Sequence, residues 1–275
     1  MSELVETGRS WGGRAYRETL ADLWQHRELL YFLAWRDIKV RYKQAALGVA
    51  WAIIQPLFTM ITFSFLFGRL AGIQSNGVPY PLFSYAALVL WIYLSTTLTL
   101  AGNSLVGNSN LITKVYFPRI MLPAACALGG LLDLLAGSGF LVAMMFYYHV
   151  VPGWSILLTP FFVLQTVLLL IGLGMLFAAM NVRYRDVKYA IPFLTQIWLF
   201  VTPIIYPVTF VPARFQGLMA LNPMAGIVEG FRGSLFGVGT VDWQLVGVSW
   251  LVTLVLLAIG GTYFSRTERV FADYV

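Results

Sequence analysis

The chain has 275 residues, of which 59% are hydrophobic and 11% are charged. Soluble domains carry about 25% charged residues, so this composition excludes an ordinary soluble enzyme and indicates a membrane protein. The formal net charge of +6 does not indicate a nucleic-acid-binding protein, because the basic residues lie beside long apolar runs, where they attract anionic lipid headgroups. The single cysteine, Cys126, excludes an internal disulfide bond.

Six long runs that are almost free of charged residues predict six transmembrane helices. A helix rises about 1.5 Å per residue and the hydrocarbon core is about 30 Å thick, so roughly 20 apolar residues cross it. The predicted fold class is therefore an all-α membrane protein, with a six-span domain over residues 48–265. The expected spans cover residues 48–67, 83–104, 121–148, 158–181, 190–207 and 243–265.

The positions of the lysines and arginines orient these spans. Of 18 such residues, only Arg69, Arg214 and Arg232 fall on the side opposite to the others. Basic residues are enriched in the cytoplasmic loops of membrane proteins. We therefore expect a multi-pass protein of the cytoplasmic (inner) membrane with both termini in the cytoplasm. Residues 1–25 and 266–275 are predicted to be cytoplasmic tails.

Residues 26–47 precede the first span and mix apolar, aromatic and basic side chains. This pattern is typical of an amphipathic helix that lies in the plane of the lipid headgroups. Basic side chains at this level pair with phosphate groups, and an arginine can do so in a bidentate manner. We predict that the helix binds lipid phosphate at this level, and a simple membrane anchor is the alternative. The basic residues concerned are Arg36, Lys39, Arg41 and Lys43.

Residues 208–241 hold two apolar pieces that are too short to span the membrane, separated by Asn222 and Pro223. Non-helical backbone at membrane depth survives only where it is buried in protein or lines a watery cavity. We therefore predict re-entrant helices between spans 5 and 6 that shape an exit, and a plain outer loop is the alternative. The predicted exit residues are Asn222, Pro223, Glu229 and Arg232.

Catalytic and nucleotide-binding motifs are missing from the sequence. No lysine follows a glycine, so the phosphate-binding loop of P-loop ATPases is absent and the chain is not expected to hydrolyse ATP by itself. His26 and His149 are expected on opposite sides of the membrane, which excludes a metal site that they share. We predict no catalytic residue and no metal site.

Asp133 is the one acidic residue that lies well inside an expected span. Ionisable groups within the membrane mark transport pathways or proton relays by default. However, no lysine or arginine occupies the centre of any expected span. We therefore favour a structural role over a proton relay, with Asp133 either neutral or bonded to serine or threonine hydroxyls at a helix contact.

Aromatic, hydroxyl and amide side chains recur at helical spacing along spans 1 and 5. Aromatic rings pack on the apolar face of a pyranose, while hydroxyl and amide groups bond to its hydroxyls. An ion pathway would instead need rings of carbonyl or carboxylate groups. We predict a sugar path, and helix packing with an interfacial aromatic belt is the alternative. The predicted path residues are Trp51, Gln55, Phe58, Thr62, Trp198, Phe200, Thr202 and Tyr206.

Four segments, in this order along the chain, resemble the ABC-2 type permeases that export polysaccharides. The first begins RDIKVRYK and runs into the first span, and the last reads LNPMAGIVEGFRGSLFG. The resemblance extends over residues 26–265. The four segments are residues 36–56, 109–123, 181–207 and 221–237.

This resemblance implies a homodimer that works with two copies of a separate ATPase, which binds the ATP and magnesium, so this chain itself carries no cofactor. It implies a lipid-linked polysaccharide as substrate, such as O-antigen, capsule or teichoic acid. It also implies that residues 36–43 belong to an interface helix, 110–117 to a coupling helix and 221–236 to a re-entrant pair. The residues expected to couple to the ATPase are Asn110, Lys114, Tyr116, Arg183, Arg185 and Asp186.

Three other functions stay open at this point. An ABC-2 exporter of a small drug or lipid would have a closed apolar pocket. A proton-coupled lipid flippase would depend on Asp133 and would not need ATP. A membrane-embedded glycosyltransferase would need a catalytic pair of acidic residues, and Glu229 and Asp242 on the outer side have no evident base or metal partner.

Overall fold

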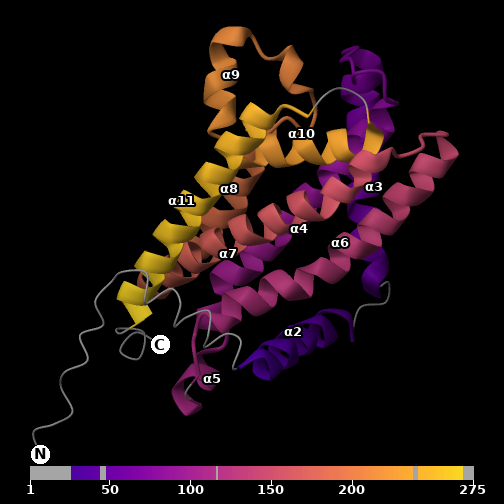
Figure 1. Cartoon of the computed structure of the whole chain (residues 1–275). Coiled ribbons are helices and arrows are strands. Elements are labelled where there is room, and N and C mark those ends of the chain that lie inside the picture. Colours follow the sequence, from indigo (N-terminus) through magenta and orange to yellow (C-terminus); the bar gives the residue numbers. More distant parts are fainter. Residues whose placement is uncertain (1–25, 44–47, 116, 238–240, 269–275) are drawn as a thin grey trace, which may run out of the picture.

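The structure is a computed structural model that describes residues 26–43, 48–115, 117–237 and 241–268, and every regular element in these ranges is a helix (Figure 1). The predicted tail over residues 1–25 lies outside the described residues. The α-helices are α2 Arg27–Tyr42, α3 Trp51–Phe63, α4 Tyr80–Gly107, α5 Ser109–Lys114, α6 Met121–Tyr147, α7 Thr159–Arg183, α8 Val187–Val201, α9 Ala213–Ala220, α10 Pro223–Phe236 and α11 Trp243–Glu268.

Five helical segments among the described residues are long and apolar enough to cross a membrane. The first of them joins α3 to a 3₁₀ turn before it and to the π-helix Ser64–Leu70 after it. All five lie on expected spans, and the chain is a multi-pass membrane protein. The five segments are Gly48–Leu70, Tyr80–Gly107, Met121–Tyr147, Trp154–Arg183 and Trp243–Glu268.

The predicted extent of the fifth span, residues 190–207, is wrong at its end. Helix α8 has 15 residues and ends at Val201, which gives a length of about 22 Å, short of the hydrocarbon core. Thr202 is extended, with φ −87° and ψ 141°, because the ring of Pro203 disfavours a helical conformation in the residue before it. The apolar run continues past this point, but the helix does not.

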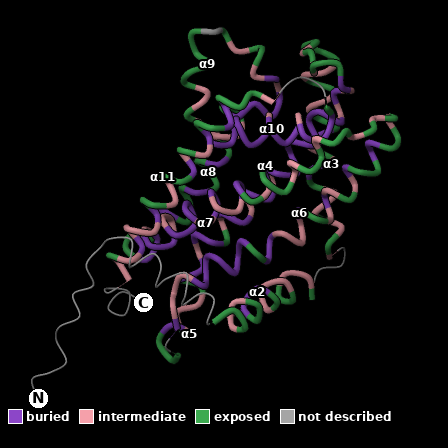
Figure 2. Tube along the Cα trace, viewed as in Figure 1, coloured by how far each residue is buried: buried purple, intermediate pink, exposed green. Residues whose placement is uncertain are grey.

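Helix α4 forms the centre of the bundle and packs against α3, α6, α7, α8 and α10. Figure 2 shows α4 and α10 largely buried and α9 largely exposed. Helices α7 and α11 approach closely at two glycines: a Cβ atom added at Gly260 would lie 2.0 Å from the carbonyl oxygen of Gly172. Small residues permit this kind of close backbone contact between membrane helices.

Helices α9 and α10 meet at the predicted break. The side chain of Asn222 accepts a hydrogen bond from the backbone N–H of Met224, and Pro223 occupies the first helical position, where its missing N–H is tolerated. Helix α10 ends at Gly237, whose φ of +61° closes the helix in the left-handed conformation. Helix α5 lies at the opposite end of the bundle from α9 (Figure 1).

Candidate functional site

Helix α2 lies along the first half of α6 (Figure 1). Its buried face carries Leu33 and Ala34, and the carbonyl oxygen of Ala34 comes close to Gly129 of α6. Tyr31 and Phe32 on the other side are 68% and 63% exposed. Such exposed rings suit the boundary between headgroups and acyl chains.

The face of α2 that points to α6 continues from Leu33 through Asp37 to Arg41, since residues four apart share a helix face. Arg41 pairs with Asp133 of α6 through one guanidinium nitrogen and one carboxylate oxygen, Oδ2. The other oxygen, Oδ1, is buried and accepts no hydrogen bond within the described part of the chain. The expectation that serine or threonine hydroxyls hold Asp133 is therefore wrong, because its partner is an arginine from outside the spans.

A pocket of about 520 Å³ opens beside this ion pair. A second pocket, of about 260 Å³, shares Thr96, Thr99 and Pro192 with it, so the two are neighbours along α4. The wall of the larger pocket combines a basic, an acidic, an aromatic and several hydroxyl or amide groups. The residues that supply these groups are Arg41, Asp133, Trp51, Gln55, Tyr93, Thr96 and Thr99.

The sequence reasoning missed the contribution of α4 to this pocket. Tyr93, Thr96 and Thr99 recur at a spacing of three, which places them on one helix face. This polar stripe inside an apolar span could have predicted that α4 contributes to the pocket. Of the predicted path residues of span 1, Trp51 and Gln55 line the pocket, whereas Phe58 and Thr62 lie on the exposed side of α3.

The structure separates the four basic residues that were predicted to bind phosphate together. Arg36 pairs with Asp37 at 2.8 Å and donates a hydrogen bond to Oδ1 of Asn108 at 2.9 Å. Lys39 lies over the ring of Trp35, with its nitrogen 5.6 Å from the ring centroid, and Lys43 is exposed. Of these four residues, only Arg41 lines the larger pocket.

The predicted path residues of span 5 do not line the larger pocket. Trp198 donates from Nε1 to Oδ1 of Asn222 at 2.9 Å, and the Asn222 amide nitrogen donates to the hydroxyl of Thr202 at 3.0 Å. These bonds join the end of α8 to the break between α9 and α10. Phe200 is exposed, and the Tyr206 hydroxyl donates back to its carbonyl at 3.2 Å.

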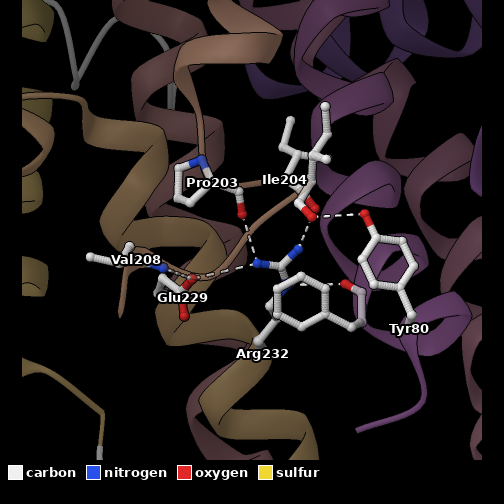
Figure 3. Close-up of polar contacts among 8 residues, drawn as sticks. Tyr80, Pro203, Ile204, Val208, Glu229 and Arg232 are labelled. Carbon is white, nitrogen blue, oxygen red and sulfur yellow. Dashed lines mark hydrogen bonds and ion pairs between the residues drawn. The ribbon is translucent and has the colours of Figure 1, made fainter. Parts of the chain in front are cut away.

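A buried arginine holds the chain that follows α8 (Figure 3). Arg232 of α10 is 4% exposed and donates to the carbonyl oxygens of Phe83 at 3.0 Å, Pro203 at 2.7 Å and Ile204 at 2.7 Å. Oε1 of the neighbouring Glu229 lies 3.5 Å from Nη1 of Arg232. Burial lowers the pKa of the Arg232 guanidinium to about 10, so the group stays protonated at neutral pH.

Two further bonds complete the cluster around Arg232. The Tyr80 hydroxyl donates to the carbonyl oxygen of Ile205 at 2.7 Å, and the backbone N–H of Val208 donates to Glu229 at 3.1 Å. Buried backbone groups that leave a helix need other partners, and α4 and α10 supply them here. The predicted exit residues Asn222, Glu229 and Arg232 thus fix the shape of residues 202–208.

Exposed polar residues gather at the opposite end of the bundle. Asn110 and Lys114 of α5 are exposed, and the predicted coupling residue Tyr116 lies outside the described residues. Asn181 of α7, which precedes the exposed loop 183–186, donates to the carbonyl oxygen of Gly102 within α4, at 3.0 Å. This loop contains Arg183, Arg185 and Asp186.

No group of three histidine, cysteine, aspartate or glutamate side chains in the described ranges is placed to hold a metal ion. The larger pocket instead offers a cation, its carboxylate partner, an indole ring and hydroxyl oxygens. Such a set suits an anionic group attached to a polar ring, because a guanidinium binds the anion and the ring packs on the indole.

A model of the family described as ABC-2 type transporter matches residues 28–236. The chain is 26% identical over 257 residues to the O-antigen export system permease protein RfbA of Myxococcus xanthus, an alignment that covers 92% of this chain and 98% of that protein. It is also 26% identical to the protein of the same name from Klebsiella pneumoniae, over 90% of this chain and 94% of that one. The polysialic acid transport protein KpsM of Escherichia coli is 21% identical, over 86% and 93%. The chain belongs to the ABC-2 type transporter family.

Proposed function

We propose that this chain is the transmembrane subunit of an ABC exporter that moves a lipid-linked polysaccharide, such as O-antigen, capsule or teichoic acid, out across the cytoplasmic membrane. The observation that carries the proposal is the similarity to O-antigen export permeases over nearly the whole length of both chains. The ring, hydroxyl and amide groups of the larger pocket support a sugar polymer as substrate. A separate ATPase chain supplies the energy, because this sequence has no phosphate-binding loop.

The working assembly is a homodimer with two copies of the ATPase. Support for the dimer comes from large apolar side chains that α3, the π-helix after it and α8 leave exposed in the single chain. Helix α8, continued by the non-helical residues 202–207, forms the fifth of six spans, α9 and α10 re-enter the membrane from outside, and both termini lie in the cytoplasm. The exposed apolar residues of α3, of the π-helix after it and of α8 include Trp51, Phe58, Ile61, Phe65, Phe193, Ile197 and Phe200.

Transport then follows from the positions of the predicted residues. Lys39, Lys43 and the neighbouring Arg36 attract the anionic lipid group to α2, and the glycan passes Trp51 and Gln55 along α3. Helix α5 and the loop with Arg183, Arg185 and Asp186 dock on the ATPase and transmit its movement to α4 and α6. The outer cluster around Arg232 shapes the exit.

The test is reconstitution of the purified chain in proteoliposomes, with and without a candidate ABC ATPase chain. We expect the permease alone to show no ATP turnover, and the complex to hydrolyse ATP and to move a lipid-linked glycan to the far leaflet. Stimulation by a small hydrophobic drug, with no movement of glycan, would replace the proposal by a drug exporter. Lipid movement driven by a proton gradient, without ATP and abolished by Asp133→Asn, would replace it by a flippase.

A further inference from the structure

The ion pair between Arg41 and Asp133 is a chemically incomplete contact on the wall of a pocket. The two side chains are 25% and 19% exposed, and both line the larger pocket. Asp133 uses one oxygen, while its buried Oδ1 has no partner among the described residues. An unsatisfied buried acceptor is unfavourable, so this carboxylate is poised to accept a hydrogen-bond donor.

We propose that this pocket binds the phosphate or diphosphate group of a lipid-linked glycan together with the first sugar, and that Asp133 holds Arg41 in place until the anion displaces it. The proposal deepens the proposed function and rests on it. The phosphate binds the guanidinium of Arg41 in place of Asp133. The freed carboxylate of Asp133 then accepts hydrogen bonds from hydroxyls of the sugar.

The chemistry of the pair favours this exchange. Asp133 contacts a single guanidinium nitrogen, whereas a phosphate group offers several oxygens and can bind a guanidinium in a bidentate manner. Removing the partner of a buried charge is strongly unfavourable. The exchange therefore requires a new partner for both Arg41 and Asp133. A phosphorylated sugar supplies both, an anion for Arg41 and hydroxyl donors for Asp133.

The other lining residues of the pocket suit a sugar rather than another anion. The hydroxyls of Thr96 and Thr99 already donate to carbonyl oxygens of their own helix, at 2.6 Å and 2.9 Å, so toward the pocket they present acceptor lone pairs. Sugar hydroxyls are the donors that such acceptors need. Trp51, which is 53% exposed, offers a ring for the apolar face of a pyranose.

The test measures binding of radiolabelled farnesyl diphosphate to the full-length chain in nanodiscs of neutral lipid. We expect Arg41→Gln to weaken binding by about tenfold, the value of one lost charge-assisted bond, and Asp133→Asn to leave binding equal or tighter, because a competitor for Arg41 is removed. Arg69→Gln, which removes an exposed arginine from the π-helix that follows α3, is the matched control and should change nothing. Equal losses in Arg41→Gln and Asp133→Asn would overturn the displacement.

Competitors identify the source of the anion. Farnesol and inorganic diphosphate should compete poorly, whereas strong competition by added phosphatidylglycerol would replace the glycan carrier by an ordinary anionic lipid. Should Arg41→Gln fail to fold, Arg41→Lys keeps the charge but loses the bidentate geometry, and unchanged binding in that variant would overturn the role of Arg41. If the wild-type complex exports glycan but Arg41→Gln binds farnesyl diphosphate as wild type does, this inference is refuted and the proposed function stands. A complex that moves no glycan refutes the proposed function, whatever the probe does.

Discussion

Replacing Arg232 by methionine should destabilise the protein by about 3–5 kcal/mol, the range found when one partner of a buried ion pair is removed. Methionine fills much of the same volume but cannot donate. The carbonyl oxygens of Phe83, Pro203 and Ile204 then lose their donor, and Glu229 loses its counterion. Each unsatisfied buried group costs about 1–3 kcal/mol, but these costs do not add fully, because water enters and the chain relaxes.

The assay is unfolding of the purified chain in mixed micelles with an increasing fraction of SDS, followed by tryptophan fluorescence. Arg214→Met, at an exposed arginine of α9, is the control and should stay within about 0.5 kcal/mol of wild type. Hydrogen exchange gives a local measurement, and we expect faster exchange over residues 202–208 in Arg232→Met. Wild-type stability together with unchanged exchange in that segment would refute the view that Arg232 holds it.

Two further substitutions test other contacts. Gly260→Ala should destabilise the contact of α7 with α11 by about 1–3 kcal/mol, because the added Cβ meets the backbone of Gly172, whereas Gly247→Ala on the same helix has open space and should be neutral in the same SDS assay. Asn108→Ala removes the acceptor of Arg36 and should lower transported glycan per ATP hydrolysed in the reconstituted complex, and an unchanged ratio would show that this bond carries no coupling.

Local sequence signals predicted some elements in place, if not in extent. The coupling helix expected over residues 110–117 is present as α5 over Ser109–Lys114, but its predicted end is wrong, because Val115 is extended, with φ −130° and ψ 129°. Asn222 and Pro223 predicted the break that starts α10. These signals work because capping and the missing N–H of proline act over a few residues.

Pairings between distant segments were harder to predict. The partner of Asp133 was sought inside the spans, but it comes from α2, which lies 92 residues earlier in the chain. Leu33, Asp37 and Arg41 are four residues apart and therefore share one face of α2. Because this face contacts α6, a search along it would have identified Arg41 as a partner for Asp133. The end of α8 was missed for another reason, since the apolar run outweighed the effect of Pro203 on Thr202.

Helix α2 connects the two ends of the proposed mechanism. Arg36 bonds to Asn108, the residue that immediately precedes α5, and Arg41, about 7.5 Å further along the helix axis, pairs with Asp133 in the pocket. In the proposed mechanism, a shift of α5 against the ATPase reaches α2 through this bond, and a shift of α2 changes the distance between Arg41 and Asp133. By the reciprocity of linked equilibria, an anion that separates this pair also biases the position of α5. In this mechanism, binding of the lipid phosphate and docking of the ATPase act on the same helix at points about one and a half turns apart.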